Sequence, residues 1–377
     1  MFDYETLRVI WWLILGTLLI GFAVMDGFDL GVGAVFRSLG RTDAERRALL
    51  ASIEPVWDGN QVWFILGGGA VFAAWPVLYA TAFSGLYLAM LLLLFAFILR
   101  PVGFAYRNKL TDPRWRKTWD WAVFFGGTIP ALLCGVAIGN LFLGLPFHFD
   151  ELRRPVYTGS FFGLLHPYAL LTGFVSLSML IMHGCTYAAL KVGEPMSSRA
   201  LALGRTAATT FILAFIIAGV WVSVAMGGYR IDAAAAVGVG ESALDHVYVS
   251  QNGWLENYRV HSLFWLAPVA ALVFAFGTRA LLGIGRAGAA FVSSSLTLAA
   301  TILTAGFALF PFLMPSSEAH DDSLTVWNAS SSERTLRIML LAVVIFLPII
   351  LAYTTWVFRV LKGRITLDTV RGHGELY

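Results

Sequence analysis

Long apolar runs constrain this chain more than any other feature of its sequence. A helix needs about 20 mostly apolar residues to cross the hydrocarbon core of a bilayer. A membrane-barrel strand would show only about ten residues of alternating character, so the runs predict helices. The nine candidate spans are Val9 to Phe36, Val56 to Ala74, Pro76 to Leu99, Trp119 to Gly144, Tyr168 to Val192, Ala200 to Gly227, Leu263 to Leu282, Ala287 to Phe312 and Leu336 to Leu361.

The composition agrees with an all-α polytopic membrane protein. Apolar residues make up 58% of the chain and charged residues 13%, whereas a soluble domain keeps about 25% of its residues charged. A net charge of +3 gives no indication of nucleic-acid binding. Cys134 and Cys185 lie in apolar runs and are interpreted as small buried side chains rather than metal ligands. No small-residue cleavage site follows the first run, so we expect that span to remain.

The basic residues predict the orientation of the spans. If the N-terminus is outside, 19 of the 26 Lys and Arg residues fall on the inner side and seven on the outer side. Positive charge accumulates in cytoplasmic loops because such loops resist translocation. The asymmetry therefore favours an odd number of spans, with the N-terminus outside and the C-terminus in the cytoplasm.

Five ionisable residues occur in or beside the first four spans. Charged side chains in a bilayer are costly, and those that persist usually face a protein interior or water. With the predicted orientation, all five lie toward the cytoplasmic face. They are Asp26, Asp29, Asp58, Arg100 and Asp120.

These residues suggest a route by which protons enter from the cytoplasm, built mainly on Asp58 and Asp29. Carboxyl groups shielded from water can exchange protons near neutral pH when charged groups surround them. The alternative is a static network that holds the helices together or anchors them at the interface. That alternative stays open, above all for Asp26, and for Arg100 and Asp120 at the expected span ends.

The histidines argue against a haem on this chain. A bis-histidine site needs two histidines at matching depth on facing helices, and only His183 lies well inside a span. A single buried histidine is more often part of the packing than a ligand. We therefore expect no haem or metal ligand here.

Several short motifs together resemble subunit II of cytochrome bd ubiquinol oxidases, and the match covers most of the chain. The outer segment from Tyr229 to Tyr258 contributes nothing recognisable. The motifs are Asp26-Gly27-Phe28-Asp29-Leu30-Gly31, Trp57-Asp58-Gly59-Asn60-Gln61-Val62-Trp63, Phe72-Ala73-Ala74-Trp75-Pro76, Arg100-Pro101-Val102-Gly103-Phe104 and Phe310-Pro311-Phe312-Leu313-Met314-Pro315-Ser316-Ser317.

The resemblance implies a subunit of a terminal oxidase in a bacterial plasma membrane, which oxidises quinol and reduces dioxygen to water. Subunit I of the family holds two haems b and one haem d and the quinol site. Subunit II resembles it in fold, with two four-helix bundles and a peripheral helix. Some members hold a structural quinone in subunit II, which no motif here locates. Whether a small single-helix subunit joins the complex is not encoded in this chain.

The resemblance also assigns roles to residues. The acid of the Trp-Asp-Gly-Asn motif lies on a proton path in the family and corresponds to Asp58, and the Gly-Phe-Asp acid corresponds to Asp29. Nearby charged family positions correspond to Arg100 and Asp120. Glu54 stands where a small or neutral residue is expected, so it adds a charge beside the path.

The resemblance suggests a division of the chain into three parts. Residues 1–145 would form the first bundle with the acidic cluster, residues 146–315 the second bundle with an outer loop at 228–261, and residues 316–377 an outer loop, the last span and a cytoplasmic tail. Two other functions remain as alternatives. One is a proton-coupled secondary transporter, but transporters tend to show inverted repeats and none is evident in this sequence. The other is a scaffold that only supports the haem-bearing subunit.

Overall fold

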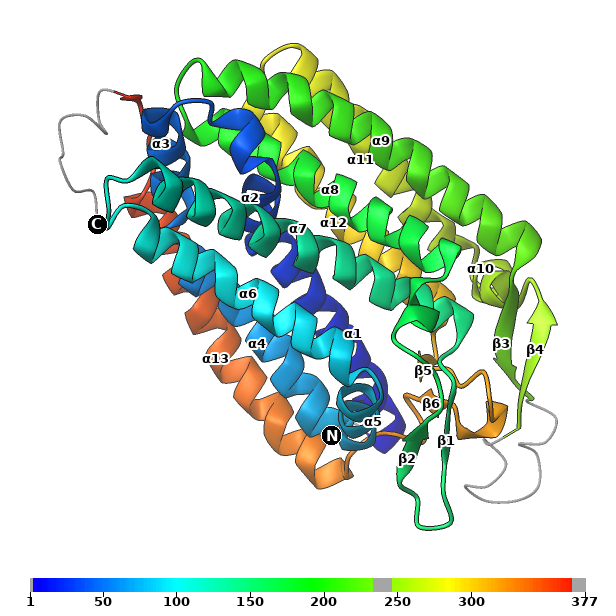
Figure 1. Ribbon diagram of the computed structural model, residues 1–377. Coiled ribbons are helices and arrows are strands. Elements are labelled where there is room, and N and C mark those ends of the chain that lie inside the picture. The colour runs from blue at the N-terminus through cyan, green and yellow to red at the C-terminus, as the bar shows by residue number, and fades with distance from the viewer. Residues whose placement is uncertain (1–2, 233–245, 368–377) are drawn as a thin grey trace.

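The structure is a computed structural model that describes residues 3–232 and 246–367. Helices dominate it, and six short strands pair into three two-stranded antiparallel sheets at one end of the bundle (Figure 1). The helices are α1 (Tyr4–Met25), α2 (Gly27–Leu39), α3 (Asp43–Ile53), α4 (Trp57–Ala74), α5 (Pro76–Gly85), α6 (Tyr87–Arg107), α7 (Pro113–Leu143), α8 (Pro167–Lys191), α9 (Met196–Ala225), α10 (Glu256–Val260), α11 (Leu266–Gly283), α12 (Ala287–Leu309) and α13 (Glu333–Val360). The strands are β1 (Phe147–Phe149), β2 (Pro155–Tyr157), β3 (Gly227–Ile231), β4 (Val247–Gln251), β5 (Phe312–Met314) and β6 (Leu324–Thr325).

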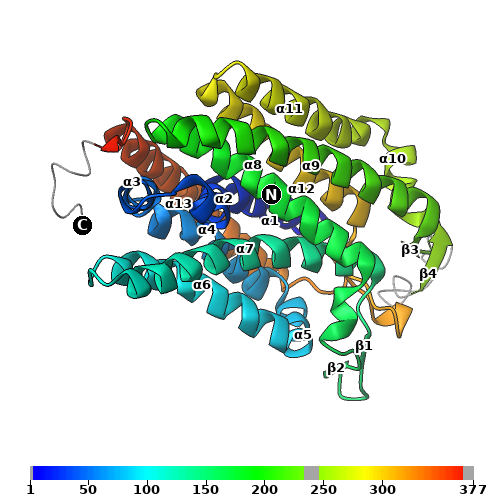
Figure 2. The same cartoon turned by 45° about the horizontal axis from the view of Figure 1, so that its top comes forward.

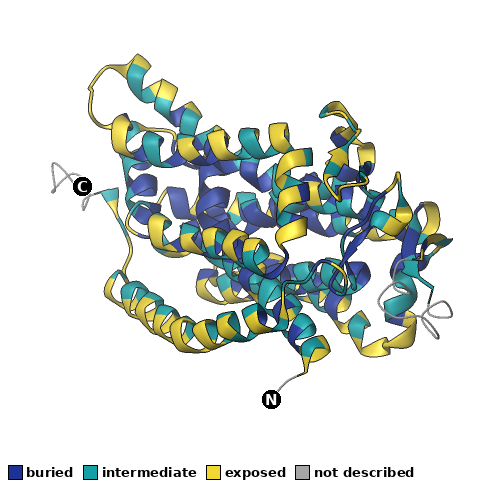
Figure 3. Cartoon of the chain, turned by 90° about the horizontal axis from the view of Figure 1, so that it is seen from below, coloured by how far each residue is buried: buried dark blue, intermediate teal, exposed yellow. Residues whose placement is uncertain are grey.

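The prediction of about nine spans is confirmed. Within the described residues, eight helical segments are long and apolar enough to cross a membrane, with α1 and α2 counted together. The bent pair α4 and α5 makes a ninth if it is counted as one span. Buried residues gather in the middle of the bundle, while the outward faces of the helices are exposed, as suits a protein surrounded by lipid (Figure 3).

The predicted third span has a different boundary. The chain turns by 116° between α4 and α5, and Pro76 occupies the first turn of α5. Proline disfavours a helical conformation in the residue before it and is well tolerated where a new helix starts. The predicted run from Pro76 to Leu99 is therefore divided between the short α5 and the span α6, which continues to Arg107.

Small residues let the central helices approach closely. α2 packs between α7 and α8, where a Cβ added at Gly31 would lie 2.0 Å from the Leu180 carbonyl oxygen of α8. A Cβ added at Gly127 of α7 would lie 2.6 Å from the Ala34 amide nitrogen. Helix association in membranes depends on such close backbone packing. α8 and α12 lie beside α1 and α2 (Figure 2). The division of the chain near residue 145 remains a prediction.

The last helix is peripheral. Of the 28 residues of α13, all of which are described, Leu336 is the one buried residue. The start of α13 is held beside α1, because Trp11 Nε1 donates to the Leu336 carbonyl oxygen at 3.0 Å. Its end is held beside α8, where Lys191 Nζ donates to the Leu361 carbonyl oxygen. α1 begins and α13 ends at opposite ends of the bundle, as an odd number of crossings requires.

Candidate functional site

The break between α1 and α2 carries the first two predicted acids. Asp26 lies between the two helices, and its side chain makes no capping hydrogen bond. Asp29 follows in the first turn of α2, and both side chains are fully buried. The break therefore places two carboxyl groups in the interior of the bundle at the junction of two helices.

Arg100 is the counter-ion of Asp26. Its Nη2 lies 2.7 Å from Asp26 Oδ1, and neither side chain is exposed at all. The sequence predicts Arg100 at the end of a span, and the helix α6 continues for two more turns to Arg107. Gly126 of α7 gives the two helices room, since a Cβ there would lie 2.9 Å from the Arg100 amide nitrogen.

Asn60 is the partner of Asp29. Its Nδ2 donates to Asp29 Oδ2 at 2.8 Å, and Asn60 is itself buried near the start of α4. We call Asp26, Asp29, Asn60 and Arg100 the break cluster. It joins α1, α2, α4 and α6 at one point.

The break cluster is incompletely satisfied by the protein. Four buried atoms make no hydrogen bond to any described residue: Asp26 Oδ2, Asp29 Oδ1 and the Nε and Nη1 of Arg100. Two carboxyl groups share one guanidinium, so one carboxyl group has no counter-charge within the cluster. Buried polar groups in native proteins are nearly always paired, and exceptions cluster where they serve a function.

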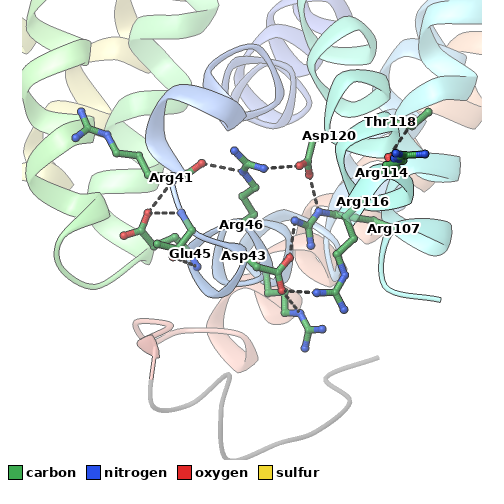
Figure 4. A network of polar contacts seen from close by, with 12 residues as sticks. Arg41, Asp43, Glu45, Arg46, Arg107, Arg114, Arg116, Thr118 and Asp120 are labelled. Atoms are coloured by element: carbon green, nitrogen blue, oxygen red, sulfur yellow. Dashed lines mark hydrogen bonds and ion pairs between the residues drawn. The ribbon is translucent and has the colours of Figure 1, made fainter. Parts of the chain in front are cut away.

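Asp120 belongs to a different group at the α3 end of the bundle. Its two carboxylate oxygens each lie 2.6 Å from an arginine nitrogen, one of Arg46 and one of Arg107. Asp43 pairs in turn with Arg107 and Arg116, both at 2.9 Å. We call Asp43, Asp120, Arg46, Arg107 and Arg116 the rim network (Figure 4). Both carboxylates in it are fully paired with cations.

Glu45 extends this polar end toward α9. It closes a capping box with Thr42 at the start of α3 and accepts from Arg199 Nη1 at 2.8 Å. The hydrogen bond from Arg199 holds the pKa of Glu45 below its usual range, against the opposing effect of burial. Glu54, which the sequence marked as an extra charge, caps the end of α3 and is half-buried, and burial raises its pKa.

Asp58 lies apart from both groups. It stands in the first turn of α4, within the predicted second span, and its side chain is exposed. It is two residues from Asn60, which contacts Asp29. Glycines beside Asp58 and farther along α4 leave open space, because a Cβ added at Gly59, Gly68 or Gly69 would meet no atom within 4 Å.

The five predicted residues thus occupy three places. Asp26, Asp29 and Arg100 come together, Asp120 joins the rim network, and Asp58 lies on an open helix face. Sequence reasoning missed two partners. Asn60 belongs to the same Trp-Asp-Gly-Asn motif as Asp58. Arg107 follows Arg100 by seven residues, a spacing that puts both side chains on one face of a helix.

Among the described residues, His183 is the one fully buried histidine. Both ring nitrogens of His183 contact protein atoms, Ser294 Oγ at 2.7 Å and the Val24 carbonyl oxygen at 3.0 Å. His148 lies 3.2 Å from Glu318 near the strands. Among the residues that the structure describes, no group of three or more His, Cys, Asp or Glu side chains could hold a metal ion.

Known proteins similar to this chain were found by sequence and by structure. Residues 7–361 match the family described as "Cytochrome bd terminal oxidase subunit II". The chain is 48% identical to "Cytochrome bd-I ubiquinol oxidase subunit 2" of Escherichia coli (strain K12) over 100% of both chains. It is 46% identical to "Probable cytochrome oxidase subunit 2" of Haemophilus influenzae over 98% of each. A solved structure, "The structure of bd oxidase from Geobacillus thermodenitrificans", shares the fold with a TM-score of 0.69 and 15% identity, over 94% of this chain and 98% of that one.

Proposed function

Because the chain belongs to the cytochrome bd terminal oxidase subunit II family, we propose that it carries protons from the cytoplasm toward the site of dioxygen reduction in its partner. The chain is a subunit of a terminal oxidase complex in a bacterial plasma membrane. Its partner is subunit I, and haems are present in the complex. Ubiquinol, named for the Escherichia coli relative, is the proposed reductant.

The break cluster carries the proposal. Asp29 is fully buried, and one of its carboxyl oxygens has no protein partner. Arg100 compensates the charge of Asp26 at 2.7 Å, which leaves Asp29 as the carboxyl group without a cation. A carboxyl group in that position is suited to hold and release a proton in the interior of the protein.

Asp58 is the proposed collecting group. It is exposed in the first turn of α4. Asn60, two residues farther along the helix, donates a hydrogen bond to Asp29. The distribution of the basic residues along the sequence supports a cytoplasmic location for this end of α4. Protons would be taken up at Asp58 and held at Asp29, while Asp26 and Arg100 keep the helices in register. We assign Asp120 the static role, because both of its oxygens already face arginines.

The open face of α4 is the proposed contact with subunit I. Exposed positions 58, 62, 65, 69 and 72 follow each other in steps of four and three, so they share one side of the helix. Glycine along such a face allows another helix to approach closely. The exposed side of α13, including Ile338, Leu341 and Ile345, is suited to lipid or to a small single-helix subunit.

The three haems, two b and one d, are proposed to lie in subunit I. The buried histidine of this chain uses both ring nitrogens in hydrogen bonds to protein atoms. A haem ligand needs one of those nitrogens for the iron. The structure assigns no site to a structural quinone.

The experiment compares Asp29→Asn and Asp58→Asn in the assembled complex. Oxygen consumption per haem is expected to fall at least about a hundredfold in each, the lower end of the contribution of a positioned proton-transfer group. Glu151→Gln, an exposed carboxylate at the strand end, is the matched control and should leave turnover unchanged. If both variants kept full haem content and normal turnover, the proposed proton route would be rejected and a purely structural role for this subunit would be favoured.

Copurification separates an oxidase subunit from a transporter. The protein is expected to copurify with a haem-bearing partner and to move no solute alone in vesicles. Proton-coupled uptake by the isolated chain would contradict the proposal.

A further inference from the structure

His183 of α8 connects two helices through both of its ring nitrogens. Its side chain is fully buried. Nε2 lies 3.0 Å from the Val24 carbonyl oxygen, and Nδ1 lies 2.7 Å from Ser294 Oγ of α12. A carbonyl oxygen can only accept, so Nε2 carries the hydrogen and donates to Val24. In the neutral ring Nδ1 then accepts from the Ser294 hydroxyl, whose one hydrogen is shared with the Phe291 carbonyl oxygen 2.9 Å away.

Val24 lies two residues before Asp26, where α1 ends. In an unbroken helix its carbonyl oxygen would accept from the amide of residue 28, one turn later. Here it accepts from His183, while backbone bonds from Asp26 to Phe22 (2.9 Å) and from Leu30 to Asp26 (3.0 Å) flank the break. Insertion of a side chain into the hydrogen-bond ladder is a known cause of helix breaks.

We propose that His183 is a positioning residue that fixes the break between α1 and α2 and so aims Asp26 at Arg100 and Asp29 at Asn60. The inference rests on the proposed function, since those two contacts form the break cluster. α8 holds the break from one side, and α4 and α6 supply Asn60 and Arg100 from elsewhere in the bundle.

The surroundings of His183 are built to hold its ring. The ring stacks on Phe291 of α12, with centroids 4.8 Å apart and planes 19° apart. Thr186 Oγ1 lies 3.2 Å from Ser294 Oγ and donates to the His183 carbonyl oxygen at 2.6 Å. A Cβ at Gly184 would lie 2.5 Å from the Gly31 carbonyl carbon, so the backbones of α8 and α2 are in close contact beside the ring.

A packing role alone makes a different prediction. If His183 only filled space, an apolar side chain of similar size would serve, and the identity of the donor would not matter. If the bond to Val24 sets the break, an amide side chain should substitute for the imidazole, because its N–H can donate to Val24 and its oxygen can accept from Ser294.

The test compares His183→Leu with His183→Gln in the assembled complex, normalised to haem content. We expect His183→Leu to lower oxygen consumption about tenfold, because small misplacements of reacting groups have effects of that order or larger. The carboxyl C=O bands of its redox-induced infrared difference spectrum should also shift. His183→Gln should restore both within about twofold. Met182→Leu, a neighbouring and equally buried position, is the packing control and should change neither.

Two results would overturn the inference. One is a His183→Leu complex with normal turnover and unshifted carboxyl bands, and the other is a His183→Gln complex as impaired as His183→Leu. If His183→Leu does not assemble, Ser294→Ala removes the hydroxyl that orients the ring, and unshifted bands there would also overturn it. The infrared bands report carboxyl position whether or not Asp29 carries protons in turnover, so this failure is distinguishable from failure of the proposed route.

Discussion

The break cluster and the rim network use the same kinds of side chain in opposite ways. In the rim network each carboxylate oxygen of Asp120 meets an arginine nitrogen at 2.6 Å, and arginines outnumber acids. In the break cluster acids outnumber the single arginine, and buried polar atoms of Asp29 and Arg100 lack protein partners. The complete pairing of the rim network is suited to holding helices together. The unpaired atoms of the break cluster are the basis of its proposed role in proton transfer.

Removing Arg100 should have the largest effect. Arg100→Leu leaves Asp26 buried without its counter-ion, which costs about 3–5 kcal/mol for a buried pair. We expect little assembled complex, measured as haem per unit of membrane protein. The double variant Asp26→Asn with Arg100→Leu removes both charges and should recover much of the assembly. Normal assembly of the single variant would mean that the pair does not support the fold.

Removing Asp120 should affect stability more than turnover. Asp120→Asn weakens two ion pairs and leaves buried Arg107 with Asp43 as its remaining acid, for a loss of about 2 kcal/mol. The midpoint of thermal unfolding of the complex should fall, while oxygen consumption per haem stays unchanged. A loss of turnover as large as that of Asp29→Asn would place Asp120 on the proton route and dissolve the distinction drawn here.

Acid should weaken the link between α3 and α9 by a smaller amount. The Arg199 hydrogen bond lowers the pKa of Glu45 in the folded protein. Its stabilisation is therefore complete above the unfolded pKa of about 4.3 and is lost as the pH falls through the lower folded value. Glu45→Gln should cost about 1 kcal/mol at neutral pH and flatten the decline in thermal stability below about pH 4. If Glu45→Gln left the loss of thermal stability below about pH 4 unchanged, the pairing of Glu45 with Arg199 would not be its cause.

The spans could be predicted from the sequence because hydrocarbon imposes length and apolarity on each run separately. The break at Asp26 could not, because Asp26 lies within the single predicted run from Val9 to Phe36. The boundary at Trp75 was predicted, but the short helix α5 that follows it was not. The positions of Asp58 and Arg100 depend on how each helix is rotated against its neighbours. Arg100 was taken for a span end because a charge normally stops a run, yet Asp26 neutralises it and α6 continues. The exposure of Asp58 depends on which side of α4 the other helices cover, and no pattern in the sequence indicates that side.

The bend after α4 has a consequence for the membrane around it. α4 has 18 residues and rises about 27 Å, a little less than the hydrocarbon thickness of about 30 Å. A short helix thins the adjacent lipid or draws its polar end inward. We therefore expect the acyl-chain length of the lipid to affect how easily water reaches Asp58, which lies in the first turn of α4.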